Sequence, residues 1–314
     1  MTLFETVAKG YRSGFVALIG RPNVGKSTLV NQLVGEKVAI TSPIAQTTRN
    51  RLKAILTTSK AQLVILDTPG IHKPNHLLGE RLVQSSRKSI GEVDLVMLMF
   101  DLSALPGKGD AFIVNLLKNQ KIPVLVTLNK CDLISENNLA DRISQYKYFL
   151  AESTWPVHLC SAISGEGCQG LIDRVIDFLP EGPQLYPPNM VSDQPEKFLF
   201  AELIREQVLL NTREEIPHSV AVRIDRVDEI PFKDNKSTKE VYTAILATVL
   251  VERKSQKGIL IGKGGNMLKT IGTKARQQMQ KLINGKVYLE LLVKVVPNWR
   301  SKPSRLEELG YEGK

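Results

Sequence analysis

Long apolar runs are missing from this sequence of 314 residues, and none approaches the roughly 20 residues that a membrane-spanning helix requires. Residues 1–12 include acidic and polar side chains where a secretory signal peptide would be apolar. Cysteine is also scarce: Cys131, Cys160 and Cys168 form an odd count without metal-ligand spacing. We therefore expect a cytoplasmic protein whose cysteines are reduced and packed in the interior.

Acidic residues are nearly absent from one part of the chain. Residues 253–302 contain twelve lysines and arginines but only one acid, Glu290, so this segment carries a net charge of +11. Because the whole chain carries +10, the remainder is close to neutral. A solvated charged face normally mixes both signs, so a polyanionic partner explains this segment better than a plain surface does.

The first 180 residues repeat short apolar runs separated by turns and helix-like stretches. The runs are residues 15–19, 62–66, 95–100, 124–128 and 157–160. Continuous apolar runs of this length are typical of a mainly parallel sheet that is buried on both faces. Residues 51–57 precede the second run by too few residues for a crossover helix, so we expect that pair of strands to be antiparallel. The pattern predicts an α/β domain over residues 1–180.

The composition changes after residue 180. Five prolines fall between residues 180 and 197, and few residues there could form a core, so residues 181–197 are interpreted as a linker. Beyond it the pattern predicts a helix over 198–211, strands over 219–227 and 241–251, a charged loop at 234–239, a helical stretch over 257–284 and a third strand over 287–296. Residues 198–314 are therefore expected to form a smaller α+β domain with a C-terminal tail.

A glycine-rich motif follows the first apolar run. Its residues are Gly20, Arg21, Pro22, Asn23, Val24, Gly25, Lys26 and Ser27, followed by Thr28. The spacing G-x-x-x-x-G-K-S between a strand and a helix is that of a phosphate-binding loop, in which backbone N–H groups and the helix N-terminus surround phosphate oxygens. Lys26 is expected to contact the β- and γ-phosphates, and Ser27 to ligate Mg²⁺. The alternative, a glycine-rich turn with a surface lysine, explains the flanking strand and helix less well.

Three shorter motifs follow at the ends of later predicted strands. They are Asp67-Thr68-Pro69-Gly70, Asn129-Lys130-Cys131-Asp132 and Ser161-Ala162. Asp67 is expected near the metal, and the Gly70 N–H near the γ-phosphate. The Asp132 carboxylate can accept hydrogen bonds from N1–H and the 2-amino group of guanine, which adenine does not offer. The N–H groups of Ser161 and Ala162 are candidates for guanine O6, and the motifs in this order predict a site for GTP or GDP.

Taken together, the motifs resemble the translation-factor-related GTPases and, within them, the Era family. The resemblance rests on residues 20–27, 67–70 and 129–132 and on Gln46-Thr47-Thr48-Arg49, which alone would be interpreted as a polar surface loop. It implies that the last segment is switch I and that Thr48, with Thr47 as the second choice, ligates Mg²⁺ beside Ser27 and Asp67. It also implies catalytic roles for Asn23, Lys26, Thr48 and Gly70 in hydrolysing GTP to GDP and phosphate.

Ile71 stands where small GTPases carry a glutamine that orients the attacking water. Isoleucine forms no side-chain hydrogen bond, so another group must position the water. In GTPases that this chain resembles, an asparagine at the position of Asn23 helps to hold K⁺ beside the phosphates, and we expect K⁺ here. The alternative for Asn23 is a turn residue. His72 and His76 have no third ligand nearby, so they are interpreted as part of a switch segment rather than a metal site.

The basic segment contains a second glycine motif. Its candidate RNA contacts are Ile261, Gly262, Lys263, Gly264, Gly265 and Lys269, which form the end of an apolar run, a G-x-x-G turn and the start of a helix. Glycines allow the loop backbone to lie against a sugar–phosphate strand, and lysines neutralise phosphate charge. A lone G-x-x-G is usually only a turn, but its place between predicted helices in the +11 segment favours a KH domain. The order of elements resembles the type II KH domain of the Era family.

The family resemblance implies a GTP-hydrolysing switch that binds single-stranded ribosomal RNA near the 3′ end of the small-subunit RNA during assembly of the small ribosomal subunit. It also implies peripheral association with the cytoplasmic face of the inner membrane, and we expect a monomer. Two alternatives stay open: a GTPase of tRNA modification, which would carry further catalytic segments, and a static RNA-binding scaffold with a structural nucleotide site. Since no predicted nucleotide contact lies beyond Ala162, we expect the first domain to hydrolyse GTP without the second.

Overall fold

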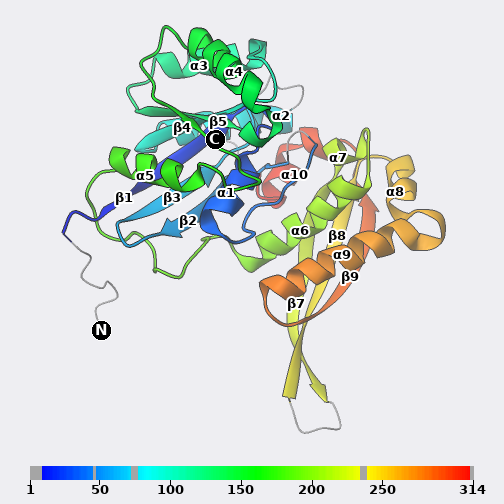
Figure 1. Ribbon diagram of the computed structural model, residues 1–314. Helices are drawn as coiled ribbons and strands as arrows, with labels where there is room; N and C mark the ends of the chain where they lie inside the picture. The colour runs from blue at the N-terminus through cyan, green and yellow to red at the C-terminus, as the bar shows by residue number, and fades with distance from the viewer. Residues whose placement is uncertain (1–8, 45–46, 72–76, 234–238, 312–314) are drawn as a thin grey trace.

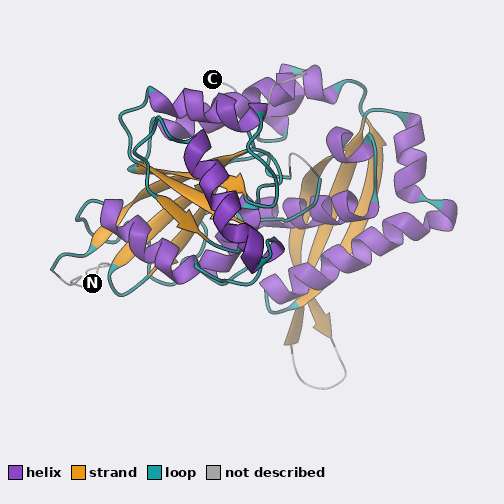
Figure 2. Ribbon diagram, turned by 45° about the horizontal axis from the view of Figure 1, so that its top comes forward, coloured by secondary structure: helices purple, strands orange, loops and turns teal. Residues whose placement is uncertain are grey.

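The computed structural model describes residues 9–44, 47–71, 77–233 and 239–311 (Figure 1). These residues form a six-stranded sheet and a three-stranded sheet, each with helices packed against it (Figure 2). No helix in the described ranges is long and apolar enough to cross a membrane.

The first sheet is mainly parallel, as the continuous apolar runs predict. Its strands in spatial order are β2 (Leu52–Thr57), β3 (Ala61–Asp67), β1 (Arg12–Gly20), β4 (Leu95–Asp101), β5 (Val124–Asn129) and β6 (Val157–Leu159). β2 is antiparallel to β3, while β1, β3, β4, β5 and β6 run parallel. The expected antiparallel pair is confirmed. Because the parallel strands end at the same edge, the loops that follow them meet there, and this edge carries the nucleotide motifs.

Helices cover both faces of this sheet. They are α1 (Lys26–Val34), α2 (Leu77–Ile90), α3 (Lys108–Lys118), α4 (Glu136–Phe149) and α5 (Cys168–Phe178), with a short 3₁₀ turn, η1 (Cys131–Leu133). Successive side chains of a strand point to opposite faces. On β4, Met97 therefore packs in one apolar cluster with residues of α1 and α5, and Leu98 packs in another with residues of α3 and α4.

The proline-rich segment after α5 lies against the edge of the first sheet. The Ile55 N–H donates to the Val191 carbonyl oxygen at 2.9 Å, and the Lys53 ammonium lies 2.8 Å from the Asp193 carboxylate. β2 is the edge strand, so this segment satisfies part of its otherwise open hydrogen-bonding side. The predicted linker is therefore packed on the first sheet and is not a free tether.

The second sheet belongs to an α+β unit. Its strands are β7 (Ala221–Lys233), β8 (Lys239–Val251) and β9 (Lys286–Val295), and its helices are α6 (Glu196–Asn211), α7 (Ile216–Ser219), α8 (Lys254–Ile261), α9 (Asn266–Leu282) and α10 (Pro303–Glu308), with 3₁₀ turns η2 (Lys263–Gly265) and η3 (Trp299–Ser301). β8 pairs antiparallel with β7 and parallel with β9, and α8 and α9 supply the crossover that a parallel pair requires. The predicted α+β KH fold is confirmed. The domain limits 1–180, 181–197 and 198–314 remain predictions.

Two details of the second unit differ from the sequence prediction. The helical stretch expected over residues 257–284 is two helices, because Gly262, Gly264 and Gly265 adopt positive φ angles that end α8 and precede α9. Of the expected charged loop, residues 234–238 lie outside the described residues and Lys239 begins β8.

The two units share a buried apolar contact. Leu78 and Leu82 of α2 pack in one cluster with Trp299 and Leu306 from the C-terminal part of the chain. The Trp299 indole N–H donates to the Ser219 carbonyl oxygen at 2.8 Å, which satisfies its polar group in the interior. The helix that follows the Asp67–Gly70 motif is therefore packed directly on the KH unit.

Candidate nucleotide and RNA sites

The phosphate-binding loop connects β1 to α1. Gly25 has a φ of +100°, and a side chain there would approach the Asn129 amide nitrogen to 2.3 Å. A side chain at Gly20 would approach the Met99 carbonyl oxygen to 2.6 Å. Asn23 also lies in the left-handed region, with a φ of 64°. The turn therefore needs glycine at Gly20 and Gly25, as the motif predicts.

Lys26 lies over the loop and is 6% exposed. Its ammonium donates to the carbonyl oxygens of Gly20 at 3.1 Å and Arg21 at 2.9 Å. Burial lowers the pKa of Lys26 to about 8, and the charge of Asp67 acts in the opposite direction. This buried cation has carbonyl partners but no direct carboxylate bond, so anionic phosphates at the loop would stabilise it.

The three residues predicted to ligate Mg²⁺ converge. The Ser27 hydroxyl donates to Asp67 Oδ2 at 2.7 Å, the Thr48 hydroxyl donates to the same oxygen at 3.0 Å, and the two hydroxyls are 2.8 Å apart. Asp67 is fully buried, and its Oδ1 has no hydrogen-bond partner among the described residues. Burial raises the pKa of the Asp67 carboxyl, against the effect of Lys26 and the two hydroxyls. Two hydroxyl oxygens and a carboxylate with a free oxygen suit Mg²⁺.

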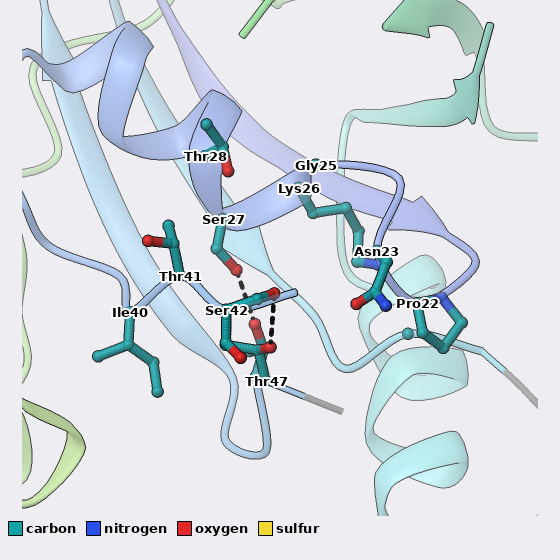
Figure 3. A pocket seen from close by; sticks show the side chains of 12 residues that line it. Pro22, Asn23, Gly25, Lys26, Ser27, Thr28, Ile40, Thr41, Ser42 and Thr47 are labelled. Carbon is teal, nitrogen blue, oxygen red and sulfur yellow. Dashed lines mark hydrogen bonds between the residues drawn. The ribbon is translucent and has the colours of Figure 1, made fainter. Parts of the chain in front are cut away.

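The geometry distinguishes the two threonines of switch I. The Thr47 hydroxyl donates to the Ile44 carbonyl oxygen at 2.7 Å, so it is engaged within its own loop. Only Thr48 of the two contacts Asp67 and Ser27. Figure 3 shows Ser27 between Thr41 on one side and Lys26 and Asn23 on the other, with Ser42 close to Ser27, and all five line one pocket. Sequence reasoning missed Thr41 and Ser42, because they belong to no motif.

The Asp67-Thr-Pro-Gly segment is held against the phosphate loop. The Thr68 hydroxyl donates to the Leu18 carbonyl oxygen at 2.7 Å, and the Pro69 carbonyl oxygen accepts the Ser86 hydroxyl at 2.8 Å. A side chain at Gly70 would approach the Pro22 backbone nitrogen to 2.8 Å, so only glycine fits there. Ile71 is 2% exposed and packs in the apolar cluster that contains residues of α3 and α4, so it does not face the pocket. His72 and His76 lie outside the described residues.

The guanine motifs meet at the ends of β5 and β6. The Asn129 amide nitrogen donates to the Val24 carbonyl oxygen at 2.8 Å, and Asn129 Oδ1 accepts the Ala162 N–H at 2.9 Å, so one side chain joins three loops. The Lys130 ammonium lies 2.5 Å from the Asp101 carboxylate. Asp132 is exposed and has no partner among the described residues, which leaves its carboxylate free to accept hydrogen bonds from a base.

The two amides that are predicted to bond guanine O6 lie in the loop after β6, and this base contact stays a prediction. The Ser161 N–H donates to the Glu166 carbonyl oxygen at 2.9 Å, and the Ala162 N–H donates to Asn129. Both amides that were assigned to guanine O6 therefore have partners within the protein. The sequence could not reveal this, because the partners come from the following turn and from a different strand.

Switch I is bonded to the KH unit on both sides of Thr48. The Arg205 guanidinium of α6 donates to the Thr47 carbonyl oxygen. The Arg49 guanidinium donates to the carbonyl oxygens of Val220 at 2.5 Å and Pro217 at 2.8 Å. The partners Arg205, Pro217 and Val220 belong to no motif, so sequence reasoning missed these contacts. They make the second domain part of the scaffold that holds the switch threonine.

The G-x-x-G loop presents its backbone and two lysines to solvent. Gly262, Gly264 and Gly265 have φ angles of 72°, 61° and 80°. A side chain at Gly262 would approach the Met267 Cβ to 2.7 Å, so this position needs glycine for space as well as for conformation. Lys263 and Lys269 are exposed, and Ile261 is half-buried behind the loop. This arrangement brings backbone and positive charge to one surface, as phosphate binding requires.

The fold and the site define a phosphate-loop GTPase joined to a KH-type RNA-binding domain. A family model described as 50S ribosome-binding GTPase matches residues 15–130, and a KH-domain model matches residues 215–300. GTPase Era of Rippkaea orientalis is 53% identical over 305 residues, which cover 97% of this chain and 94% of the relative. GTPase Era of Staphylococcus haemolyticus is 45% identical over 302 residues, covering 96% and 97%. The chain belongs to the Era family of GTPases, and its activity is hydrolysis of GTP.

Solved structures agree with the family over nearly the whole chain. A crystal structure of Era in complex with MgGDPNP and nucleotides 1506–1542 of 16S ribosomal RNA matches with a TM-score of 0.89 and 38% identity, covering 96% of this chain and all of the other. A variant of Aquifex aeolicus Era bound to GDP·AlF₄⁻ matches with the same TM-score and coverage at 37% identity. Both domains therefore share the fold of Era, including the KH domain.

Proposed function

We propose that this GTPase binds the 3′ region of small-subunit ribosomal RNA through its KH domain and acts as a GTP-dependent switch in assembly of the small ribosomal subunit. The observation that carries the proposal is the exposed G-x-x-G loop with its two lysines, in a chain whose fold matches an Era bound to a 16S RNA fragment over 96% of its length. A role in tRNA modification is less well supported. The chain covers 94% and 97% of the two GTPase Era relatives described above and 98% of GTPase Era of Heliobacterium modesticaldum.

The chain's own residues account for hydrolysis as follows. Lys26 would leave its two carbonyl partners for the β- and γ-phosphates, and Asp132 would fix the guanine base. Ser27, Thr48 and Asp67 would hold Mg²⁺, which supplies positive charge against the phosphates. The Gly70 N–H would contact the γ-phosphate. Since Ile71 is buried and its side chain forms no hydrogen bond, the backbone, another group or a conformational change has to orient the attacking water.

We propose that RNA affinity depends on the G-x-x-G loop. Replacing both Lys263→Asp and Gly264→Asp in the full-length chain is expected to weaken binding of single-stranded RNA at least about tenfold. The two acids repel phosphate, and the second puts a side chain where the backbone must approach the strand. Because the variant loses a phosphate contact, the dependence of affinity on salt should also become shallower. Fluorescence anisotropy across a salt series measures both effects.

A matched control is Lys60→Asp, which changes an exposed lysine in the turn between β2 and β3 of the first domain. It should leave RNA affinity unchanged. Circular dichroism must first establish that the double variant folds, since Gly264 has a φ of 61°. A folded double variant that binds RNA as tightly as the parent would contradict the KH assignment.

We also propose that Asn23 helps to hold K⁺ beside the phosphates. Its side-chain nitrogen donates to the Pro43 carbonyl oxygen at 2.8 Å, so the Asn23 amide joins the phosphate loop to the segment before switch I. Hydrolysis is expected to be about tenfold faster in K⁺ than in Na⁺ at equal ionic strength, because a bound cation would stabilise charge that develops on the phosphates. Asn23→Ala should remove most of that difference while GDP affinity stays within about twofold. Equal hydrolysis rates in both salts would support the alternative that Asn23 is only a turn residue.

We further propose that the protein is a cytoplasmic monomer with peripheral association at the inner membrane. The family resemblance supports this proposal, and the basic KH segment would favour contact with anionic headgroups. Light scattering and flotation with anionic vesicles test the two parts separately. A dimer, or protein that stays with the soluble fraction, would contradict the corresponding part.

A further inference from the structure

A second cavity, of about 800 Å³, lies between the two domains and shares no lining residue with the pocket at the phosphate loop. Its walls come from residues 49–51 after the switch threonine, from α2, from residues 194–198 and from the C-terminal residues 307–311. Its basic lining residues are Arg49, Arg51, Arg81 and Lys88, whereas Glu307 is the single acid of the described lining. The cavity is therefore a basic site that the GTPase reaction does not use.

Arg49 is the strongest sign that the cavity takes an anion. It is 2% exposed, and its terminal nitrogens donate to backbone carbonyl oxygens of the KH domain, while its Nε has no hydrogen-bond partner. It forms no ion pair with a carboxylate in the described part of the chain. Burial lowers the pKa of the Arg49 guanidinium, with the neighbouring Tyr311 acting in the opposite direction. A buried cation without a directly bonded carboxylate is costly, so an anion at this wall would add to the stabilisation that Glu202 and Tyr311 supply.

The other basic residues are only partly neutralised. Arg51 bonds Glu92 at 2.7 Å, but its Nε is buried and unpartnered. The Arg81 guanidinium donates to the Tyr311 carbonyl oxygen at 2.6 Å and lies 3.6 Å from Glu307.

Lys88 lies 4.0 Å from the same Glu92 carboxylate that bonds Arg51. Among the described residues, the four cations of the lining thus pair with two carboxylates, Glu307 of the lining and Glu92 beside it, which leaves an excess of two positive charges. Gln84, Ser85 and Gln194 add polar groups to the lining.

We propose that this interdomain cavity binds a phosphate-bearing anion. Guanidinium groups present several N–H donors in a plane and match the oxygens of phosphate. A volume of about 800 Å³ is in the range of small-molecule sites, so a nucleotide-sized phosphorylated molecule fits it. The same chemistry is offered by the backbone phosphates of an RNA that enters the cleft. In both cases the occupant contacts the residue after Thr48 and the KH domain together.

The test uses the full-length protein with its phosphate loop saturated by Mg·GDPNP and with ³²P-labelled pyrophosphate as the probe. Equilibrium dialysis should give saturable binding of one pyrophosphate per chain. The double variant Arg51→Gln and Lys88→Gln should weaken this binding at least about tenfold, because two charge-assisted contacts are lost. The matched control Lys118→Gln, which removes a lysine paired with Glu152 on the first domain, should leave it unchanged. Arg49 is left intact, because its bonds to the KH domain also hold the structure.

Competition distinguishes the two sources of phosphate. Single-stranded RNA is added to protein that carries Lys263→Asp and Gly264→Asp, so that the G-x-x-G loop does not contribute. Displacement of pyrophosphate would identify RNA phosphates as the ligand, and continued binding would identify a small phosphorylated molecule. Absence of saturable binding beyond the phosphate loop, or equal affinity in the double variant, would overturn the proposal. If that variant fails to fold, Arg81→Gln changes another residue of the same wall and carries the same expectation.

Discussion

Replacing Asp132 with asparagine is expected to lower the preference for GTP over XTP by about 10⁴-fold. The parent carboxylate can accept hydrogen bonds from both N1–H and the 2-amino group of guanine. An asparagine amide offers one acceptor and one donor. Its N–H donor faces another donor, the 2-amino group, when guanine is bound, but it can donate a hydrogen bond to the 2-oxygen of xanthine. Asp132 is exposed and has no protein partner among the described residues, so the substitution should change recognition without loss of the fold.

Competition of GTP, XTP and ATP against a labelled guanine nucleotide measures this selectivity directly. A matched control is Asp141→Asn, which changes an exposed carboxylate on α4 outside the motif and should leave the order of affinities unchanged. An unaltered preference for guanine in the Asp132 variant would exclude this residue as the group that reads the base.

Replacing Lys26 with methionine is expected to slow GTP hydrolysis at least about 100-fold. The substitution keeps an unbranched side chain that is one atom shorter but removes the positive charge that the β- and γ-phosphates need. Single-turnover hydrolysis at saturating GTP measures the chemical step apart from binding. A hydrolysis rate within about threefold of the parent would contradict the role of Lys26.

The same residue predicts a pH dependence of nucleotide binding. Burial lowers the pKa of Lys26 to about 8. Phosphates favour the charged ammonium, so they raise this pKa, and binding takes up a proton when the pH is above about 8. GDP affinity should therefore fall as the pH rises from 8, by up to about tenfold per pH unit, and the fall should be absent in the methionine variant. Titration calorimetry at constant ionic strength measures both affinities.

The contacts of switch I bear on whether the first domain hydrolyses GTP without the KH unit. The nucleotide motifs all lie before residue 163, and on that basis the first domain was expected to hydrolyse GTP by itself. In the fold, Arg205 bonds the Thr47 carbonyl oxygen, and Glu206 accepts the Thr41 N–H at 2.8 Å. The loop that carries Thr48 is thus positioned by α6 of the KH unit as well as by its own domain.

The sequence by itself determined the parts of this protein that depend on neighbours along the chain. The phosphate loop could be predicted because its glycines, lysine and serine occupy eight consecutive residues between a strand and a helix. The parallel sheet followed from continuous apolar runs, and the antiparallel β2–β3 pair from the short connection between them. The KH fold followed from the G-x-x-G turn, the order of elements and the concentration of basic charge. In each case the sequence pattern and the structural feature that it predicts involve residues that are close together along the chain.

Tertiary structure alone decided which distant groups meet. It brought Thr48 rather than Thr47 to Asp67, engaged the Ser161 and Ala162 amides within the protein, and laid the proline-rich segment along the edge strand. It also buried Arg49 against carbonyl oxygens that lie 168 and 171 residues away along the chain. No local pattern predicts such contacts, because a buried polar group takes whichever partner the packing of two domains brings within hydrogen-bond distance.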